Sequence, residues 1–229
     1  MGARLSSIFE IFSTKRKIRC YVLGLPDVGK TSFLFKLRLG DVETLEPVVG
    51  FEVQKVEYEN KKNTNITFYS WNVGGSISMK PLWPYYFQQS ARSRACVIFV
   101  VDATDRSRIE DARDGLYNAL KIFQSATSGA NTPDGAAILL VLANNSGPAG
   151  EQPGAMSAAE ITEALQLSSM KDRLWHVQPC SHISGHSSES NEGLEEGMKW
   201  MFETLRLSSA VRDQQLAERN RRSAQYESI

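Results

Sequence analysis

The feature that most constrains this chain is a glycine-containing segment at residues 24–31, with the sequence GLPDVGKT. It matches the pattern G-x-x-x-x-G-K-[ST], in which a loop joins a strand to a helix and wraps around nucleotide phosphates. The apolar run at 18–23 precedes the loop, as the pattern requires. The segment therefore predicts a phosphate-binding loop, the alternative being a glycine-rich turn that carries an exposed lysine.

The residue types in this segment suit contact with phosphate. Glycines allow backbone amides to approach the phosphates, and the helix dipole that begins near Gly29 favours negative charge. We expect Lys30 to reach the outer phosphates and the Thr31 hydroxyl to bind Mg²⁺. Asp27 brings a negative charge into the loop, which opposes phosphate binding. The predicted contact residues of this segment are Gly24, Asp27, Val28, Gly29, Lys30, Thr31 and Ser32.

The hydrophobic pattern predicts an α/β fold with one antiparallel edge. Apolar runs rich in β-branched residues alternate with amphipathic stretches, which is typical of parallel βαβ units. These runs are 18–23, 95–101, 137–142 and 174–177. Two extended runs, 51–58 and 66–71, flank a polar stretch and predict a hairpin that adds an antiparallel edge. Capping-box pairs, Ser107 with Glu110 and Ser157 with Glu160, predict two helix starts.

Composition limits the classes of function. With 26 basic and 26 acidic residues the chain has no net charge, so we expect no nucleic-acid partner. The three cysteines lack metal-ligand spacing and are interpreted as buried, reduced thiols. Neither a membrane span nor a secretory signal fits, so we expect a cytoplasmic location. The predicted organisation is an N-terminal segment at 1–17, one domain at 18–207 and a polar tail at 208–229, either a solvated helix or disordered.

The N-terminal segment carries a lipidation pattern. Residues 1–6, MGARLS, fit M-G-x-x-x-[ST], which predicts myristoylation of Gly2. An amphipathic run follows, and Lys15, Arg16 and Lys17 add positive charge beside it. One acyl chain binds membranes only marginally, so the apolar face and the basic residues would supply the second signal. The alternative is that the apolar stripe packs on the domain.

Several motifs together resemble the Arf and Arf-like family of small GTP-binding proteins. They are TSFLFKLRLGD at 31–41, VVGF at 48–51, WNVGG at 71–75, KPLW at 80–83, IFVVD at 98–102, AMSAAE at 155–160 and WHVQ at 175–178. The resemblance implies a P-loop NTPase small G-protein fold, with a mostly parallel six-stranded sheet and helices on both faces. It also implies GTP or GDP as the ligand, with Gly75 and Asn144 in the nucleotide site.

The same resemblance implies how the protein contacts its partners. Phe51, Trp71 and Tyr86 would form an aromatic surface for effector or scaffold proteins. For Trp71 alone, packing in the core is an equally good interpretation. In this family the hairpin changes register when GTP replaces GDP, and here the hairpin is longer than the family pattern.

Several positions depart from the family pattern. Val48 stands where a threonine binds Mg²⁺, and Asn72 replaces an aspartate, so Mg²⁺ binding is expected to be weak or absent. Ser76 replaces the glutamine that positions the attacking water, which leaves no catalytic residue assigned. The guanine-reading Asn-Lys-x-Asp becomes NNSG at 144–147, and the last guanine loop is only approximated at 180–182. Base specificity is therefore in doubt.

Three functional hypotheses remain open. The favoured one is a degenerate Arf-like protein, or pseudo-GTPase, that binds nucleotide and acts as an interaction or scaffold module with little GTP hydrolysis. The second is a competent GTP/GDP switch in membrane traffic or ciliary transport that uses non-standard residues. A P-loop phosphotransferase is the least supported, because no acceptor-binding or lid signal is present. Expected locations are a cytosolic membrane face, the cilium or the cytoskeleton.

Overall fold

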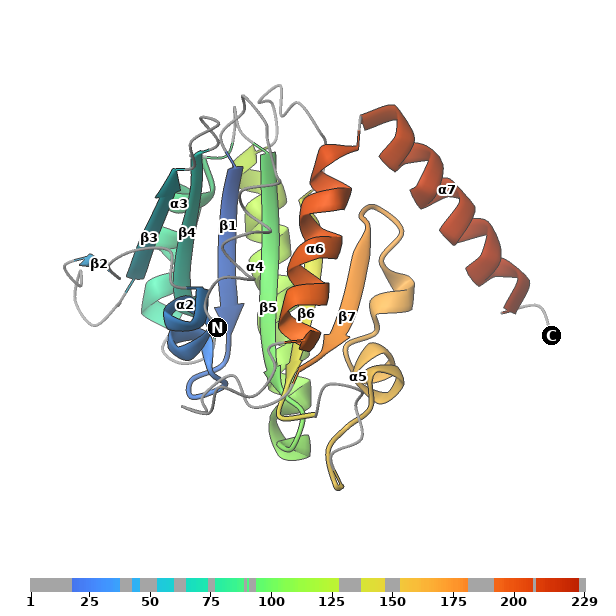
Figure 1. Ribbon diagram of the computed structural model, residues 1–229, viewed down its shortest axis with the longest axis horizontal. Helices are drawn as coiled ribbons and strands as arrows, with labels where there is room; N and C mark the ends of the chain where they lie inside the picture. Colours follow the sequence, from blue (N-terminus) through green and yellow to red (C-terminus); the bar gives the residue numbers. More distant parts are fainter. Residues whose placement is uncertain are drawn as a thin grey trace.

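The protein is built around one mixed β-sheet, shown in Figure 1. The computed structural model describes residues 18–37, 43–45, 53–59, 65–73, 77–88, 90, 94–127, 137–146, 153–180, 192–207 and 209–226. Within these residues the sheet has seven strands in the order β2-β3-β4-β1-β5-β6-β7. The strands are β1 (Ile18–Gly24), β2 (Glu43–Leu45), β3 (Val53–Glu59), β4 (Asn65–Asn72), β5 (Arg94–Asp102), β6 (Ile138–Asn144) and β7 (Trp175–Pro179).

The centre of the sheet is parallel and buried. Strand β1 pairs in parallel with β4 and β5, and β5, β6 and β7 continue the parallel order. All seven residues of β6 are buried. A parallel strand covered on both faces carries a continuous apolar run rather than an alternating one, which explains why the sequence pattern located these strands.

The predicted hairpin is confirmed, and a further strand lies outside it. Strands β3 and β4 are antiparallel, with Glu59 opposite Asn65. The short strand β2 pairs antiparallel with β3 and adds a seventh strand to the six that were predicted. Three residues, Glu-Thr-Leu, are too few to show an alternating pattern, so only the pairing reveals this strand.

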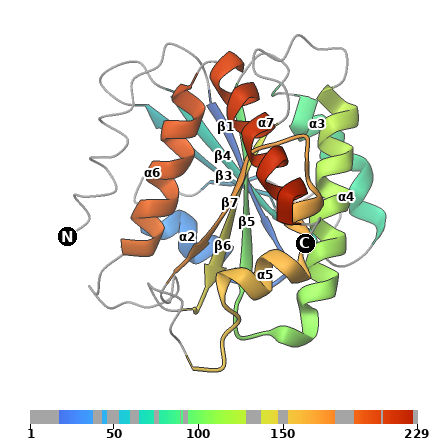
Figure 2. The same cartoon turned by 90° about the vertical axis from the view of Figure 1, so that its right-hand side faces the viewer.

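Helices cover both faces of the sheet. Figure 2 shows α2 and α6 on one side and α3 and α4 on the other. The helices are α2 (Lys30–Leu37), α3 (Trp83–Gln88), α4 (Ile109–Thr127), α5 (Ala158–Ala164), α6 (Glu192–Arg206) and α7 (Ser209–Tyr226). Helix α7 shows that most of the polar tail is helical, one of the two conformations expected for it. Among the helices described, none is both long and apolar enough to cross a membrane.

The two predicted helix starts have different outcomes. Ser157 and Glu160 form the expected capping box at the start of α5. The prediction for Ser107 is wrong, because a 3-10 helix, Arg106–Arg108, precedes α4 and its N-cap is Asp105. The Asp105 carboxylate accepts from the Arg108 amide, and the Ser107 hydroxyl donates to the same carboxylate. A carboxylate two residues earlier thus takes the capping role.

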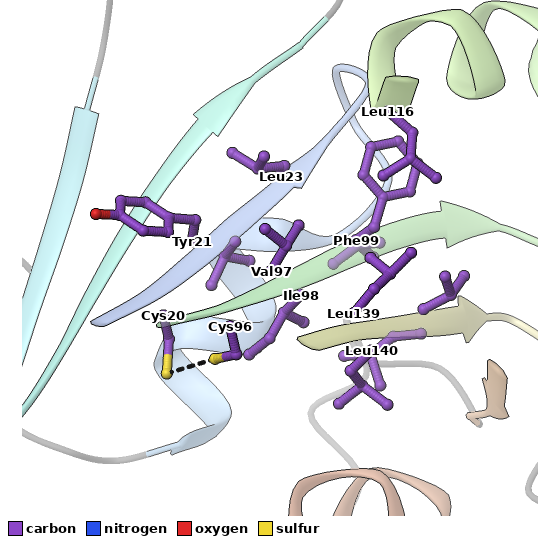
Figure 3. Close-up of a cluster of buried hydrophobic side chains, with 14 of the residues drawn as sticks. Cys20, Tyr21, Leu23, Cys96, Val97, Ile98, Phe99, Leu116, Leu139 and Leu140 are labelled. Carbon is purple, nitrogen blue, oxygen red and sulfur yellow. Dashed lines mark hydrogen bonds between the residues drawn. The ribbon is translucent and has the colours of Figure 1, made fainter. Parts of the chain in front are cut away.

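The core contains the cysteines as small apolar groups. Figure 3 shows Cys20 on β1 beside Cys96 on β5, with the Cys96 thiol donating to the Cys20 sulfur at 3.0 Å. Burial raises the pKa of the Cys20 thiol well above its ordinary value. All three cysteines are buried and free, which confirms the interpretation as reduced core residues.

Candidate nucleotide-binding site

The predicted phosphate loop lies at the carboxyl end of β1. Strand β1 ends at Gly24 and α2 begins at Lys30, so the loop has the strand-loop-helix setting that the motif requires. In the sheet register Gly24 lies opposite Asn72 of β4, and Asp102 of β5 lies opposite Asn144 of β6. The residues of the candidate site therefore lie at one edge of the parallel sheet, where such folds bind their ligands.

The loop backbone requires glycine at two places. A Cβ on Gly24 would lie 2.5 Å from the Val100 carbonyl oxygen and 2.9 Å from Cγ2 of Val28. Gly29 has a φ of 99°, and Asp27 has a φ of 64°. Aspartate tolerates this left-handed conformation better than most residues with a side chain. The loop is thus a strained, tightly packed turn rather than an exposed flexible one.

Lys30 is buried inside this turn. It is only 7% exposed, and its ammonium donates to the Leu25 carbonyl at 2.5 Å. Burial lowers the pKa of Lys30 to about 8, the nearby Asp27 raises it and Arg108 lowers it further. The alternative of an exposed lysine on a simple turn is therefore wrong. A buried cation at a helix start is suited to hold an anion.

The residues at the predicted Mg²⁺ position are Thr31, the predicted ligand, and Asn72, which stands in place of the family aspartate. Thr31 and Asn72 are both exposed, at the start of α2 and the end of β4 respectively. The Val73 amide donates to the Gly24 carbonyl at 3.0 Å and ties this end of β4 to the loop. Both residues offer only neutral oxygens. Among the described residues, no cluster of acidic, histidine or cysteine side chains could hold a metal. A hard cation here would depend on the phosphates for negative charge.

The side chains at the base end are engaged inside the protein. Asn144 is buried, and its side-chain amide donates to the Val28 carbonyl at 3.1 Å, which ties β6 to the phosphate loop. Asn145 has a φ of 62°, and its side-chain amide donates to the Asp102 carboxylate at 3.1 Å. The buried Ser146 hydroxyl donates to the Ala143 carbonyl at 2.8 Å. These three residues therefore brace the loops around the site.

The residue after β7 closes the same network. The Cys180 amide donates to the Ala143 carbonyl at 2.9 Å, and the Ser146 amide donates to the Cys180 carbonyl at 3.1 Å. Cys180 is 1% exposed. The loop that resembles the last guanine loop is thus anchored at its first residue, and residues 181 and 182 lie outside the described part.

Two of the three aromatic residues predicted for partner binding, Trp71 and Tyr86, lie in the described part of the structure. Trp71 is 2% exposed, with ring centroids 5.3 Å from Phe87 and 5.7 Å from Tyr86. The core interpretation of Trp71 is therefore supported, while Tyr86 is half-buried. The neighbouring Tyr85 is 66% exposed.

Six predicted or altered positions lie outside the described residues. They are Gly2, Val48, Phe51, Gly75, Ser76 and Gly147. Their roles remain predictions from the sequence. Conversely, Arg108 contacts the phosphate loop and was not identified, because it lies 82 residues away in the chain from its partner Pro26.

The fold and the glycine-lysine loop define a P-loop nucleotide-binding protein of the small G-protein type. Residues 5–205 match the ADP-ribosylation factor family. The chain is also 38% identical over 205 residues to ADP-ribosylation factor J of Dictyostelium discoideum, covering 90% of this chain and 94% of that protein. The protein belongs to the Arf family of small GTP-binding proteins, which confirms the family and the fold predicted above.

Proposed function

We propose that this Arf-family protein binds nucleotide mainly through its phosphates and acts as an interaction module with little GTP hydrolysis. The observation that carries the proposal is the contrast between the two ends of the site. Lys30 lies buried in the phosphate loop with a lowered pKa, whereas Asn145, at the base end, spends its side-chain amide on Asp102. The phosphate end therefore offers an anion a buried cation, whereas the Asn145 side-chain N–H at the base end is already bonded within the protein.

The phosphate end supports nucleotide binding. Several contacts hold the loop. Among them, the Val73 backbone amide donates to the Gly24 carbonyl, the Asn144 side-chain amide donates to the Val28 carbonyl, and the Phe33 backbone amide donates to the Gly29 carbonyl at the start of α2. A loop held in its binding conformation before the ligand arrives loses less entropy on binding. Preorganisation of this kind favours a retained phosphate site.

The base end supports weak selection among nucleotides. By resemblance, a lysine and an aspartate read guanine at positions that hold Asn145 and Gly147 here. Each hydrogen bond to a charged group contributes about 1.5 to 3 kcal/mol, so the loss of the aspartate pairing removes most of the preference for guanine. Asn145 is short and already bonded to Asp102, so it does not replace the lysine.

The hydrolysis machinery is altered at three positions. Val48 has no oxygen for Mg²⁺, Asn72 has lost the negative charge of the family aspartate, and Ser76 is too short to place an attacking water. We propose weak Mg²⁺ binding and negligible turnover from these three changes together.

The second candidate is a competent GTP/GDP switch. Its support is the 38% identity to ADP-ribosylation factor J across 90% of the chain. The intact phosphate loop fits this candidate equally well. The two proposals differ in turnover and in base selectivity, and these can be measured directly.

The first experiment measures turnover. One sample of natively purified protein is denatured, and the nucleotide that it releases is identified by chromatography. Single-turnover GTP hydrolysis is then followed with native protein. We expect hydrolysis near the uncatalysed rate. The matched control restores the family residues with Val48→Thr, Asn72→Asp and Ser76→Gln, and it should hydrolyse GTP faster and bind it more tightly with Mg²⁺. Wild-type turnover well above the uncatalysed rate, and as fast as that of the restored variant, would reject the proposal in favour of the switch.

The second experiment measures base selectivity. Calorimetric titrations with GTP and ATP are expected to give affinities within about tenfold of each other, since the phosphates dominate binding. The double variant Asn145→Lys with Gly147→Asp should gain a clear preference for GTP. A wild-type preference for GTP of about a thousandfold would show that other residues read the base, and it would reject the phosphate-dominated proposal.

A further inference from the structure

Arg108 joins the phosphate loop to the segment before α4. Its Nη1 donates to the Pro26 carbonyl at 3.1 Å, and its Nε pairs with the Asp105 carboxylate at 2.5 Å. The guanidinium therefore connects the middle of the loop with the turn that follows β5. Nothing in the motif itself requires this contact.

Asp105 holds this arginine in place. Its carboxylate accepts from the Arg108 backbone amide at 3.3 Å and from the Ser107 hydroxyl at 2.7 Å, in addition to the guanidinium. The hydrogen bonds from Ser107 and Arg108 lower the pKa of Asp105 below its ordinary value. The charged carboxylate pairs with the same guanidinium that contacts the Pro26 carbonyl.

The contact fixes one peptide plane of the loop. In a trans peptide the carbonyl and the following N–H point in opposite directions. When the Pro26 carbonyl points at Arg108, the Asp27 N–H of the same peptide points away from it. Asp27 has a φ of 64°, so this peptide enters a conformation that a non-glycine residue does not adopt freely. A partner on the carbonyl helps to hold the peptide there.

We propose that Arg108 is a positioning residue of the phosphate loop, which orients the Pro26–Asp27 peptide so that its amide serves the nucleotide phosphates. The inference deepens the nucleotide binding proposed above and rests on it. A loop of this kind binds phosphate through successive backbone amides, so the orientation of one peptide directly affects affinity.

The charge of Arg108 acts on the same site. Arg108 lies close enough to Lys30 to lower its pKa, while Asp27 raises it. Two cations near a phosphate site add to its attraction for anions, and the negative Asp27 opposes them. Removal of Arg108 should therefore change both the shape and the charge of the site.

Arg106 provides a matched control two residues earlier. Its guanidinium pairs with Glu160 at 2.8 Å, and both side chains are about half exposed. Arg106→Ala thus removes an arginine and an ion pair from the same 3-10 helix without touching a phosphate-loop carbonyl. Arg108→Lys keeps the charge of Arg108 but loses the planar fork.

The test is calorimetric titration of the full chain with GDP and with GTP at about pH 7. Arg108→Ala should lower the affinity about tenfold, the effect of losing one hydrogen bond from a charged group. Arg106→Ala should stay within about twofold of the wild type, because exposed ion pairs contribute little. Thermal unfolding of the nucleotide-free variants checks that both fold, and Arg108→Lys should recover part of the affinity.

The conservative variant separates positioning from general destabilisation, because Arg108→Lys keeps the charge beside the loop but loses the planar guanidinium that pairs with Asp105 and contacts Pro26. Equal affinities for Arg108→Ala and Arg106→Ala would overturn the inference alone. A wild type that binds neither GDP nor GTP would overturn the proposed function as well.

Discussion

Lys30 shows what burial adds to a motif residue. The motif predicts a lysine near the outer phosphates, but its proton affinity depends on the surrounding turn. Burial lowers its pKa to about 8, so a fraction of the free protein is neutral in mildly alkaline solution. Bound phosphate favours the charged form and raises the pKa again, so nucleotide binding above this pH takes up a proton.

We therefore predict that GDP affinity falls as the pH rises from about 7 to about 9, by up to about tenfold per pH unit above the free-protein pKa. Calorimetry in two buffers of different ionisation enthalpy should detect proton uptake at the alkaline end. Lys30→Arg keeps its charge throughout this range, so any binding it retains should not depend on pH. A wild-type affinity that stays constant across the range would contradict the prediction.

Helix α7 illustrates how an element outside the family match joins the domain. Its Arg219 donates to the carbonyls of Met170 and Arg173 at 3.0 and 2.8 Å, and the guanidinium lies 4.6 Å from the centroid of Trp175. Asn220 donates to the Lys171 carbonyl at 3.0 Å. The helix thereby packs beside the start of β7, the last strand in the order of the described sheet.

We predict that Arg219→Ala lowers the free energy of unfolding by about 1 to 2 kcal/mol, through lost hydrogen bonds and the cation-π contact. Urea unfolding followed by tryptophan fluorescence measures this, since Trp175 loses its cover. Arg221→Ala, which changes an exposed arginine of the same helix, should leave stability unchanged. Equal stability of the two variants would show that α7 does not hold to the domain through Arg219.

The hairpin of β3 and β4 is the element that the family resemblance connects to the bound nucleotide. The resemblance implies a register change between GDP and GTP forms, and Val48 lacks the oxygen that would sense the third phosphate. We predict that amide exchange across residues 51–72 is nearly the same with GDP and with GTP. In Val48→Thr a difference between the two nucleotides should appear. Strong nucleotide dependence in the wild type would support the competent switch instead.

At the scale of the whole molecule, the open question is attachment to a membrane. Gly2 lies in a lipidation pattern, and Lys15, Arg16 and Lys17 follow an amphipathic run, all outside the described residues. One acyl chain gives only marginal binding, and each basic residue near an anionic surface adds about 1 kcal/mol. We propose a peripheral, reversible association that needs both signals.

The prediction is that protein produced with an acyl-transfer system floats with anionic liposomes, and that Gly2→Ala largely abolishes this. Added salt should weaken flotation because the basic residues act through screened charge. Equal flotation of the two proteins would exclude the acyl anchor. The N-terminal segment would then be interpreted as packing on the domain or binding another protein.

The sequence alone determined the features that depend on residues close together in the chain. The phosphate loop, the buried parallel strands, the hairpin, the Ser157 capping box and the family follow from local patterns, which a short segment carries by itself. Strand β2 was not predicted because three residues are too few to show a pattern. The Asp105 cap was not predicted because the nearby Ser107 fits the capping-box pattern as well.

Only the tertiary structure decided which side chains meet across the chain. The contact of Arg108 with Pro26 spans 82 residues, and that of Asn145 with Asp102 spans 43. The lowered pKa of Lys30 likewise needs the whole surrounding turn to exclude water. Such contacts depend on how distant strands and loops are brought together at one sheet edge, and no periodicity within a segment encodes them.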